Sequence, residues 1–252
     1  MATFQIPDAR LKSALAAGET VGCHWLNLGS PMLAELAADA GAQSIVLDLQ
    51  HGSWQRQSVD NAITAIGGRA PILARVSDAS DFNIGWPLDA GCHGVIVPMI
   101  SSGAEAASVV AAAHFPPKGR RSGGGARSME NFGVYRPATA EHMLVSVMIE
   151  TREGVAAAAE IAATPGLDMI FVGPSDLSLA IGSGPGTADF DRALTHILSS
   201  GMAAKTPVGI YTGDLAQAQA RSAQGFQFVV VASDVALNRN IAAGIWRDFK
   251  AG

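Results

Sequence analysis

Eight short apolar runs, rich in β-branched residues, recur along the 252-residue chain with helical stretches between them. They lie at residues 20–28, 43–50, 71–77, 93–99, 145–150, 168–173, 207–212 and 226–232. Each run is continuously apolar rather than alternating, which is typical of strands buried on both faces of a parallel sheet. A parallel sheet with helices between its strands allows only a few architectures.

The spacing of the runs selects one of these architectures. Eight β–α units in 252 residues average about 31 residues each, which matches an α/β fold of the (β/α)8 TIM-barrel type. The alternative is an open doubly wound sheet, which usually carries a glycine-rich phosphate-binding turn after its first strand. Here residues 26–31 read LNLGSP, which is no such turn. We therefore predict one (β/α)8 barrel domain over residues 1–252.

One stretch, at about 114–136, departs from this pattern. It contains three consecutive glycines and several arginines, and we predict that it forms a long flexible loop. A solvated surface excursion is the simpler interpretation, but long loops in compact domains often act as lids or binding loops.

Composition excludes several other classes of protein. The net charge is −5, whereas nucleic-acid binding favours a basic face. No apolar run approaches the roughly 18 residues that span a bilayer, and residues 1–5 do not begin a signal peptide. Cys23 and Cys92 are too few for a disulfide framework or a cysteine-based metal site. We expect a cytoplasmic protein with no membrane or nucleic-acid partner.

The predicted strands place polar side chains at their carboxyl ends, where TIM barrels gather their chemistry. Charged residues make up only 15% of the chain, yet they recur at these positions. The candidates at or just after the strand ends are Trp25, Asn27, Asp48, Gln50, His51, Arg75, Pro98, Glu150, Gly173, Pro174, Ser175, Asp176, Tyr211, Ser233 and Asp234.

Glu150 and Asp176 are one β–α unit apart, so they would project from adjacent strands. Two carboxylates without a nearby cysteine suit a hard divalent cation such as Mg²⁺ or Mn²⁺, with open positions for water and a 2-oxoacid. The alternative is that Glu150 pairs with Arg152 or caps the following helix.

His51 follows a strand end, and Asp48 lies three residues before it. A carboxylate beside an imidazole fixes its tautomer and raises its basicity, as a general base requires. Arg75 suits a substrate carboxylate or an enolate oxygen, or else pairs with Asp48 or Glu150. None of the four lysines follows a predicted strand, which argues against a Schiff-base aldolase.

The order of the motifs resembles the HpcH/HpaI family, the class II pyruvate aldolases typified by 4-hydroxy-2-oxoheptanedioate aldolase. The resemblance runs from about Trp25 to Asp234 and is carried by these segments in order: 48–52 (DLQHG), 74–76 (ARV), 98–99 (PM), 116–121 (PPKGRR), 149–153 (IETRE) and 173–178 (GPSDLS).

The resemblance implies a carbon–carbon lyase that cleaves or forms 4-hydroxy-2-oxoacids from pyruvate, or a close 2-oxoacid, and an aldehyde. It implies that Glu150 and Asp176 hold Mg²⁺ or Mn²⁺, with Co²⁺ as a further option, and that His51, supported by Asp48, is the acid/base. Arg75 would bind the keto oxygen. Trp25, Gln50, Gly173, Pro174 and Ser175 would contact substrate. Asp89 would reach a neighbouring subunit's site in a hexamer built as a dimer of trimers.

Two positions depart from many family members: Gln50 stands in place of Glu, and Met148 in place of Gln. They put the acceptor substrate in question more than the reaction class. A citrate-lyase-like coenzyme A thioester lyase stays open as an alternative, although only residues 118–127 offer it a basic groove. A phosphoenolpyruvate-type mutase or lyase and a non-catalytic barrel that binds small acids also stay open.

Overall fold

The strands close into a parallel barrel in sequence order, with β8 paired to β1. The computed structural model describes residues 6–251. The strands are β1 (Val21–Leu26), β2 (Ser44–Asp48), β3 (Ile72–Arg75), β4 (Gly94–Val97), β5 (Leu144–Ile149), β6 (Met169–Val172), β7 (Val208–Ile210) and β8 (Phe228–Ser233). Each falls within one or two residues of a predicted run, and the predicted (β/α)8 TIM-barrel fold is confirmed.

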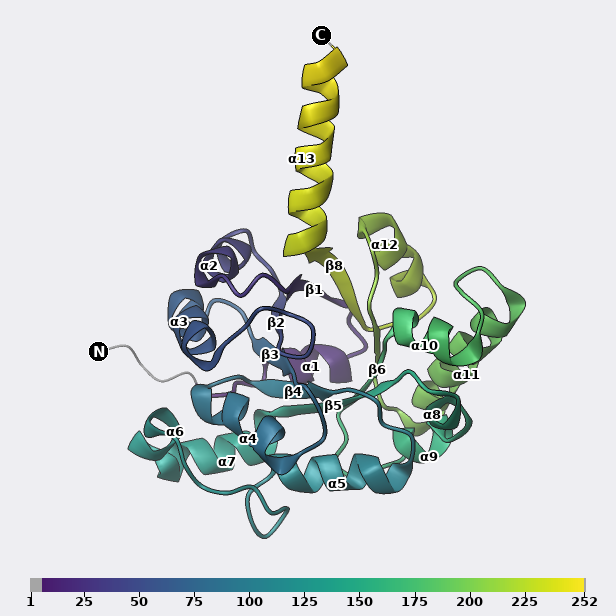
Figure 1. Ribbon diagram of the computed structural model, residues 1–252. Coiled ribbons are helices and arrows are strands. Elements are labelled where there is room, and N and C mark those ends of the chain that lie inside the picture. The colour runs from purple at the N-terminus through teal and green to yellow at the C-terminus, as the bar shows by residue number, and fades with distance from the viewer. Residues whose placement is uncertain (1–5, 252) are drawn as a thin grey trace.

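Helices connect these strands, and most of them surround the barrel (Figure 1). They are α1 (Arg10–Ala16), α2 (Pro31–Asp39), α3 (Arg56–Ile66), α4 (Asp81–Ala90), α5 (Gly103–Ala113), α6 (Ala126–Glu130), α7 (Phe132–His142), α8 (Arg152–Ala156), α9 (Ala158–Ala162), α10 (Pro174–Ile181), α11 (Ala188–Ala204), α12 (Leu215–Ala223) and α13 (Asp234–Ala251). Within residues 6–251, none of them has the length and apolar character needed to cross a membrane.

Two apolar layers form because successive side chains of a strand point to opposite faces. The outward layer packs strand residues such as Ile45 and Val97 against the helices. The inward layer fills the barrel with residues such as Val46 and Phe171, and Leu11 of α1 closes its amino-terminal end. Both faces of the wall are therefore buried, which explains why the strands read as continuous apolar runs.

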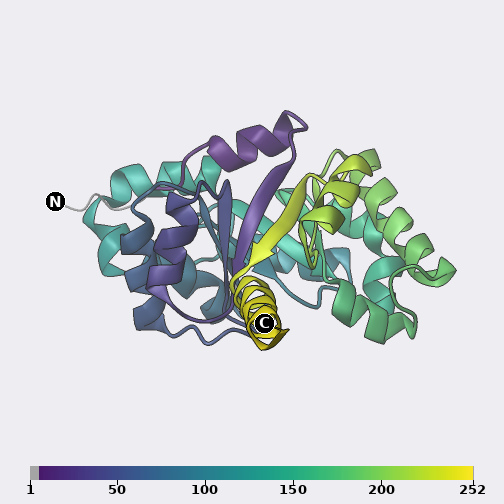
Figure 2. The ribbon, with the colours of Figure 1, turned by 90° about the horizontal axis from the view of Figure 1, so that it is seen from above.

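Helix α13 does not lie along the barrel as the other outer helices do. It begins directly after β8 and extends away from the barrel (Figures 1 and 2). Its apolar side chains are exposed, among them Ile241, Ile245 and Trp246. A groove of about 370 Å³ runs between β1, β8 and α12, where a following helix would normally pack.

The segment 114–136 is more ordered than its glycines predict. Instead of one long loop, it contains α6 and the first part of α7. Aromatic anchoring explains the difference: the rings of Phe115 and Phe132 pack edge to face at 5.3 Å, and the Tyr135 hydroxyl donates to the Leu88 carbonyl at 2.8 Å. These contacts hold the segment against α4.

Candidate active site

A pocket of about 240 Å³ opens at the carboxyl ends of the strands. The predicted site residues that line it are Trp25, Asp48, His51, Arg75, Glu150, Gly173, Pro174, Ser175 and Asp176. Gln50 and Asp89 do not line it, nor do the strand-end candidates Pro98, Ser233 and Asp234. The carboxyl ends of the strands thus bring together residues from five different β–α units.

The alternation within each strand explains how these side chains reach one pocket. Trp25, Val46, Leu73, Met148 and Phe171 point into the barrel as part of the inward layer. The residue two positions later on each strand faces the same way and lies above this apolar floor. Those residues are Asn27, Asp48, Arg75, Glu150 and Gly173.

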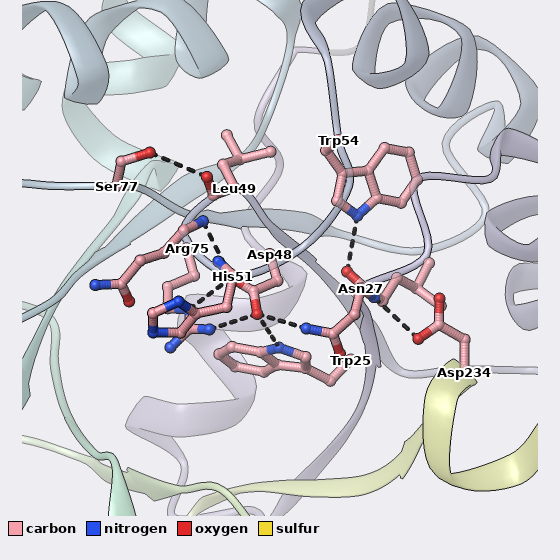
Figure 3. Close-up of polar contacts among 11 residues, drawn as sticks. Trp25, Asn27, Asp48, Leu49, His51, Trp54, Arg75, Ser77 and Asp234 are labelled. Carbon is pink, nitrogen blue, oxygen red and sulfur yellow. Dashed lines mark hydrogen bonds and ion pairs between the residues drawn. The ribbon is translucent and has the colours of Figure 1, made fainter. Parts of the chain in front are cut away.

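Asp48 and Arg75 form a buried ion pair at the centre of the pocket (Figure 3). The Arg75 Nε donates to Asp48 Oδ1 at 2.8 Å, and Arg75 Nη2 contacts Oδ2. Burial alone would raise the pKa of Asp48, but the hydrogen bonds and charge of Arg75 more than offset it, and the pKa is lowered. Asp48 is therefore a carboxylate, and Nη1 of Arg75 is the nitrogen left to meet a substrate oxygen.

Other donors complete the shell around Asp48. The Asn27 Nδ2 donates to Oδ2 at 2.6 Å, and the Trp25 Nε1 does so at 3.2 Å. The backbone amides of Gln50 and His51 donate to Oδ1, each at 3.1 Å. Among these described contacts, Asp48 meets the amide of His51 and not its imidazole. It fixes the turn that carries His51, rather than the tautomer of the ring as the sequence led us to expect.

Glu150 is buried, and only one of its two carboxylate oxygens accepts a hydrogen bond within residues 6–251. Its Oε1 accepts a 2.8 Å hydrogen bond from the amide of Met99, a residue with a φ of 61°, which L residues rarely adopt. Its Oε2 is buried and has no hydrogen-bond partner among residues 6–251. Burial raises the pKa of Glu150 to about 7, the Met99 amide opposes that rise, and the charge of Asp176 adds to it. A cation bound by both carboxylates would stabilise their charged forms and so offset the effect of burial on Glu150.

Asp176 comes to the pocket on the first turn of α10, which begins at Pro174. The first amides of a helix have no partner within it, so Ser175 and Asp176 can present N–H groups to an anion. Among residues 6–251, no cluster of three or more His, Cys, Asp or Glu side chains is placed to hold a metal. A metal here would take two carboxylates and fill its other positions with water or substrate.

Four lining residues were not among the predicted site residues: Asn27, Met148, Phe171 and Tyr211. Trp25 stacks on Phe171 at 5.5 Å and meets Tyr211 edge to face at 5.4 Å. These rings and Met148 give the pocket an apolar side. The alternation of side chains along each strand would have placed Phe171 and Met148 inside the barrel. Asn27 and Tyr211 were already among the strand-end candidates.

Asp89 lies in a different place. It pairs at 2.7 Å with Arg121, a buried side chain with 1% of its surface exposed. Both line a cavity of about 690 Å³ between α3, α4 and residues 120–127. Most arginines that line this larger cavity already have an acidic partner, since Arg120 pairs with Asp81 and Arg127 lies 3.9 Å from Asp60.

Comparisons with known proteins show the family to which the chain belongs. A family model described as HpcH/HpaI aldolase/citrate lyase matches residues 22–240. A hydroxypyruvate/pyruvate aldolase of Rhizorhabdus wittichii is 36% identical over 235 residues, covering 90% of this chain and 93% of the relative. A 5-keto-4-deoxy-D-glucarate aldolase of Shigella dysenteriae serotype 1 is 32% identical over 248 residues, with 96% of each chain covered.

A solved structure gives the same result for the fold. An HpcH/HpaI aldolase/citrate lyase family protein from Burkholderia cenocepacia J2315 superimposes with a TM-score of 0.89 and 30% identity, covering 96% of this chain and 100% of that one. The match spans the barrel and the strand ends that form the pocket. The chain therefore belongs to the HpcH/HpaI aldolase/citrate lyase family of carbon–carbon lyases.

Proposed function

We propose that this protein is a metal-dependent aldolase that forms or cleaves 4-hydroxy-2-oxoacids from pyruvate, or a close 2-oxoacid, and an aldehyde. The observation that carries the proposal is the buried Oε2 of Glu150, which has no hydrogen-bond partner and lines the same pocket as Asp176 and Arg75. The names of the relatives support the choice of pyruvate or hydroxypyruvate as the donor.

Glu150 and Asp176 are the proposed metal ligands, and the donor set fits a hard divalent cation. Two carboxylates, one of them with a raised pKa, would be stabilised by Mg²⁺, Mn²⁺ or Co²⁺. When bound, such an ion supplies a Lewis acid that polarises the keto group of the donor.

The remaining roles follow from the positions of this chain's own groups. The amides at the start of α10, at Ser175 and Asp176, would hold the donor carboxylate. Nη1 of Arg75 would stabilise the negative charge that develops on the keto oxygen as C3 loses a proton. Asp48 keeps Arg75 in place through its bonds to Nε and Nη2.

His51 is the proposed acid/base. Its side chain is exposed at the mouth of the pocket, while its amide is fixed by Asp48. In the cleavage direction it would take the proton of the 4-hydroxyl group as the C3–C4 bond breaks and the aldehyde leaves. That proton would then pass to C3 of the enolate, and in synthesis His51 would take a proton from C3 of the donor and give it to the new alkoxide. Trp25 would pack against the substrate, and Gln50 would lie beside it at the rim.

The coenzyme A alternative would need a basic groove leading to this pocket. In residues 6–251, the arginines of 118–127 instead line the separate cavity beside α4, where acidic groups pair them. This observation favours an aldehyde over a nucleotide thioester as the second substrate.

We also propose that the protein is a homo-oligomer, and we retain the hexamer as a prediction. The exposed apolar face of α13 and the uncovered groove beside β1 and β8 support self-association. A cytoplasmic location remains a prediction as well.

The decisive experiment mixes pyruvate and glycolaldehyde with the enzyme, with and without EDTA, and follows the 4-hydroxy-2-oxoacid formed. Product that appears only with a divalent metal supports the proposal. Binding of pyruvate without turnover would identify a non-catalytic barrel. Trapping of a covalent adduct by borohydride would contradict the metal-dependent route, because it reports a Schiff base.

A further inference from the structure

We propose that Asp234 is a positioning residue for the active site, which holds the end of β1 so that Asn27 meets Asp48. The inference rests on the proposed function, because it assigns Asp234 an effect on the Asp48–Arg75 pair. Asp234 is the first residue of α13, with 3% of its surface exposed, and it lies on the far side of Asn27 from Asp48 (Figure 3).

The carboxylate of Asp234 is turned toward β1. Its Oδ1 accepts the amide of Asn27 and its Oδ2 accepts the amide of Leu28, each at 2.9 Å. Two successive amides at a strand end need two separate acceptors, and a carboxylate supplies both from one side chain. The pair of bonds sets the direction in which the chain leaves β1.

Asn27 is then held at three of its polar groups. Its amide is bound by Asp234, its carbonyl accepts the Ser53 amide at 2.7 Å, and its side-chain Nδ2 donates to Asp48 Oδ2 at 2.6 Å. The turn after β2 is tied to β1 at a second point, where Trp54 Nε1 donates to the Leu26 carbonyl at 2.8 Å. The turn that carries His51 and the carboxylate that holds Arg75 therefore share one support, and Asp234 fixes it.

Helix capping does not account for this arrangement. The Ser233 hydroxyl accepts the Ala236 amide at 3.2 Å and so caps α13. The carboxylate of Asp234 accepts one bond within its own helix, from the Val235 amide, and its other two bonds go to the end of β1. Within residues 6–251, the side chain of Asp214, which caps the helix that follows β7, bonds only to Gln217 of that helix, α12.

A purely structural role would be to join β8 to β1 at the closure of the barrel. Asp168 is the matched case: its Oδ2 accepts the Val145 amide of a neighbouring strand at 2.8 Å, at the amino-terminal end of the barrel. Asp234→Asn and Asp168→Asn both replace one carboxylate oxygen with an amide group that cannot accept. The Asp234 bonds lie next to the active site, whereas Asp168, which also pairs with Lys12 at 2.7 Å, lies at the far end of the barrel.

The experiment compares kcat of the metal-loaded enzyme for Asp234→Asn, Asn27→Ala, the double variant and Asp168→Asn. We expect Asp234→Asn and Asn27→Ala each to lower kcat about tenfold, and the double variant to lose no more than about twofold further, because both act through one contact. Asp168→Asn should stay within about twofold of wild type. Thermal midpoints are measured for all four variants.

A wild-type kcat in Asp234→Asn, or losses that multiply to about a hundredfold in the double variant, would overturn the proposal. Inactive wild-type enzyme would instead overturn the proposed function. Amide hydrogen exchange separates the two cases, because Asp234→Asn should speed exchange at Leu28 and Ser53 whether or not the enzyme turns over. Unchanged exchange at the Leu28 and Ser53 amides would contradict the inference. If Asp234→Asn does not fold, Asp234→Ser is used, since its hydroxyl still accepts one amide.

Discussion

The carboxylate of Glu150 and the backbone of Gly173 share one corner of the pocket, where a β-carbon at position 173 would overlap Oε2 of Glu150. The same β-carbon would lie 2.9 Å from the terminal methyl of Met148. Gly173 has a φ of −96°, so backbone conformation does not require glycine here. The close approach of the carboxylate requires it.

Gly173→Ala should therefore displace Glu150 and lower kcat/KM at least about a hundredfold, as loss of a metal-ligating or charge-stabilising group does. Steady-state kinetics at saturating Mn²⁺ would measure the loss. Gly184→Ala is the control, because a β-carbon there meets nothing within 4 Å. Equal activity of the two variants would show that Glu150 does not depend on the space left by the missing β-carbon of Gly173.

Glu150→Gln should abolish metal-dependent turnover while leaving the fold intact. Glutamine keeps the shape of the side chain and an oxygen for the Met99 amide, but it removes the charge that holds a cation. Calorimetric titration with Mn²⁺ should show weaker binding than in wild type. Glu153→Gln, an exposed change three residues away on α8, should bind metal normally. Full activity in Glu150→Gln would remove this residue from the metal site.

Removal of one partner of the Asp48–Arg75 pair should destabilise the fold more than replacement of both partners. Asp48→Asn leaves the Arg75 charge buried without its partner, which costs about 3–5 kcal/mol of unfolding free energy. Asp48→Asn with Arg75→Met should recover much of that loss, since no unpaired charge remains. Denaturant unfolding at neutral pH measures all three proteins. A single variant as stable as wild type would mean that the pair contributes nothing to the fold.

The same pair predicts a pH dependence. The folded pKa of Asp48 lies below its ordinary value of 3.8, so its contribution to stability is fully present above that value. It is lost as the pH falls through the lowered pKa, because the unfolded chain takes up the proton first. Wild type should thus lose more stability in acid than the Asp48→Asn/Arg75→Met variant. Parallel losses in the two proteins would assign the acid sensitivity to other groups.

The sequence predicted the barrel and most of the pocket for the same reason. Strands buried on both faces read as continuous apolar runs, and a charged residue that ends such a run has few places to point except the barrel mouth. Asp48, Arg75 and Glu150 were found in this way. Gly173 and Ser175 followed from their position after the sixth run.

Contacts that depend on the three-dimensional arrangement were beyond prediction from the sequence. The bond from Asp48 to the His51 amide depends on a turn geometry that sequence spacing does not specify. The helices within 114–136 form because Phe132 packs on Phe115 and Tyr135 bonds to Leu88 of α4, which overrides the local glycine signal. The link from Asp234 to Asn27 joins the two ends of the barrel wall, 207 residues apart.

His51→Ala should lower kcat by about 10²–10⁴, the usual range for loss of a general acid/base. The fold should be unaffected, because the exposed imidazole is removed while the backbone bond to Asp48 stays. His196→Ala, on the exposed face of α11, is the control. A kcat within about twofold of wild type would transfer the proton step to another group.

The last prediction concerns Asp89, which does not line the pocket of its own chain. It lies in the last turn of α4 with its carboxylate on the buried Arg121, and both residues line the cavity between α3, α4 and residues 120–127. If it serves a site at all, that site belongs to a neighbouring subunit, as the family resemblance implies. The active site would then be completed between chains.

Mixing inactive Asp89→Asn subunits with inactive His51→Ala subunits tests this. Asn keeps the size of the side chain and an acceptor for Arg121, so the variant limits damage to the fold. Shared sites should restore part of the activity, because some pockets would draw His51 from one chain and Asp89 from another. Subunit exchange is confirmed with tagged chains. No recovery after exchange, or a fully active monomer, would show that each chain builds its site alone and that Asp89 serves only to pair Arg121.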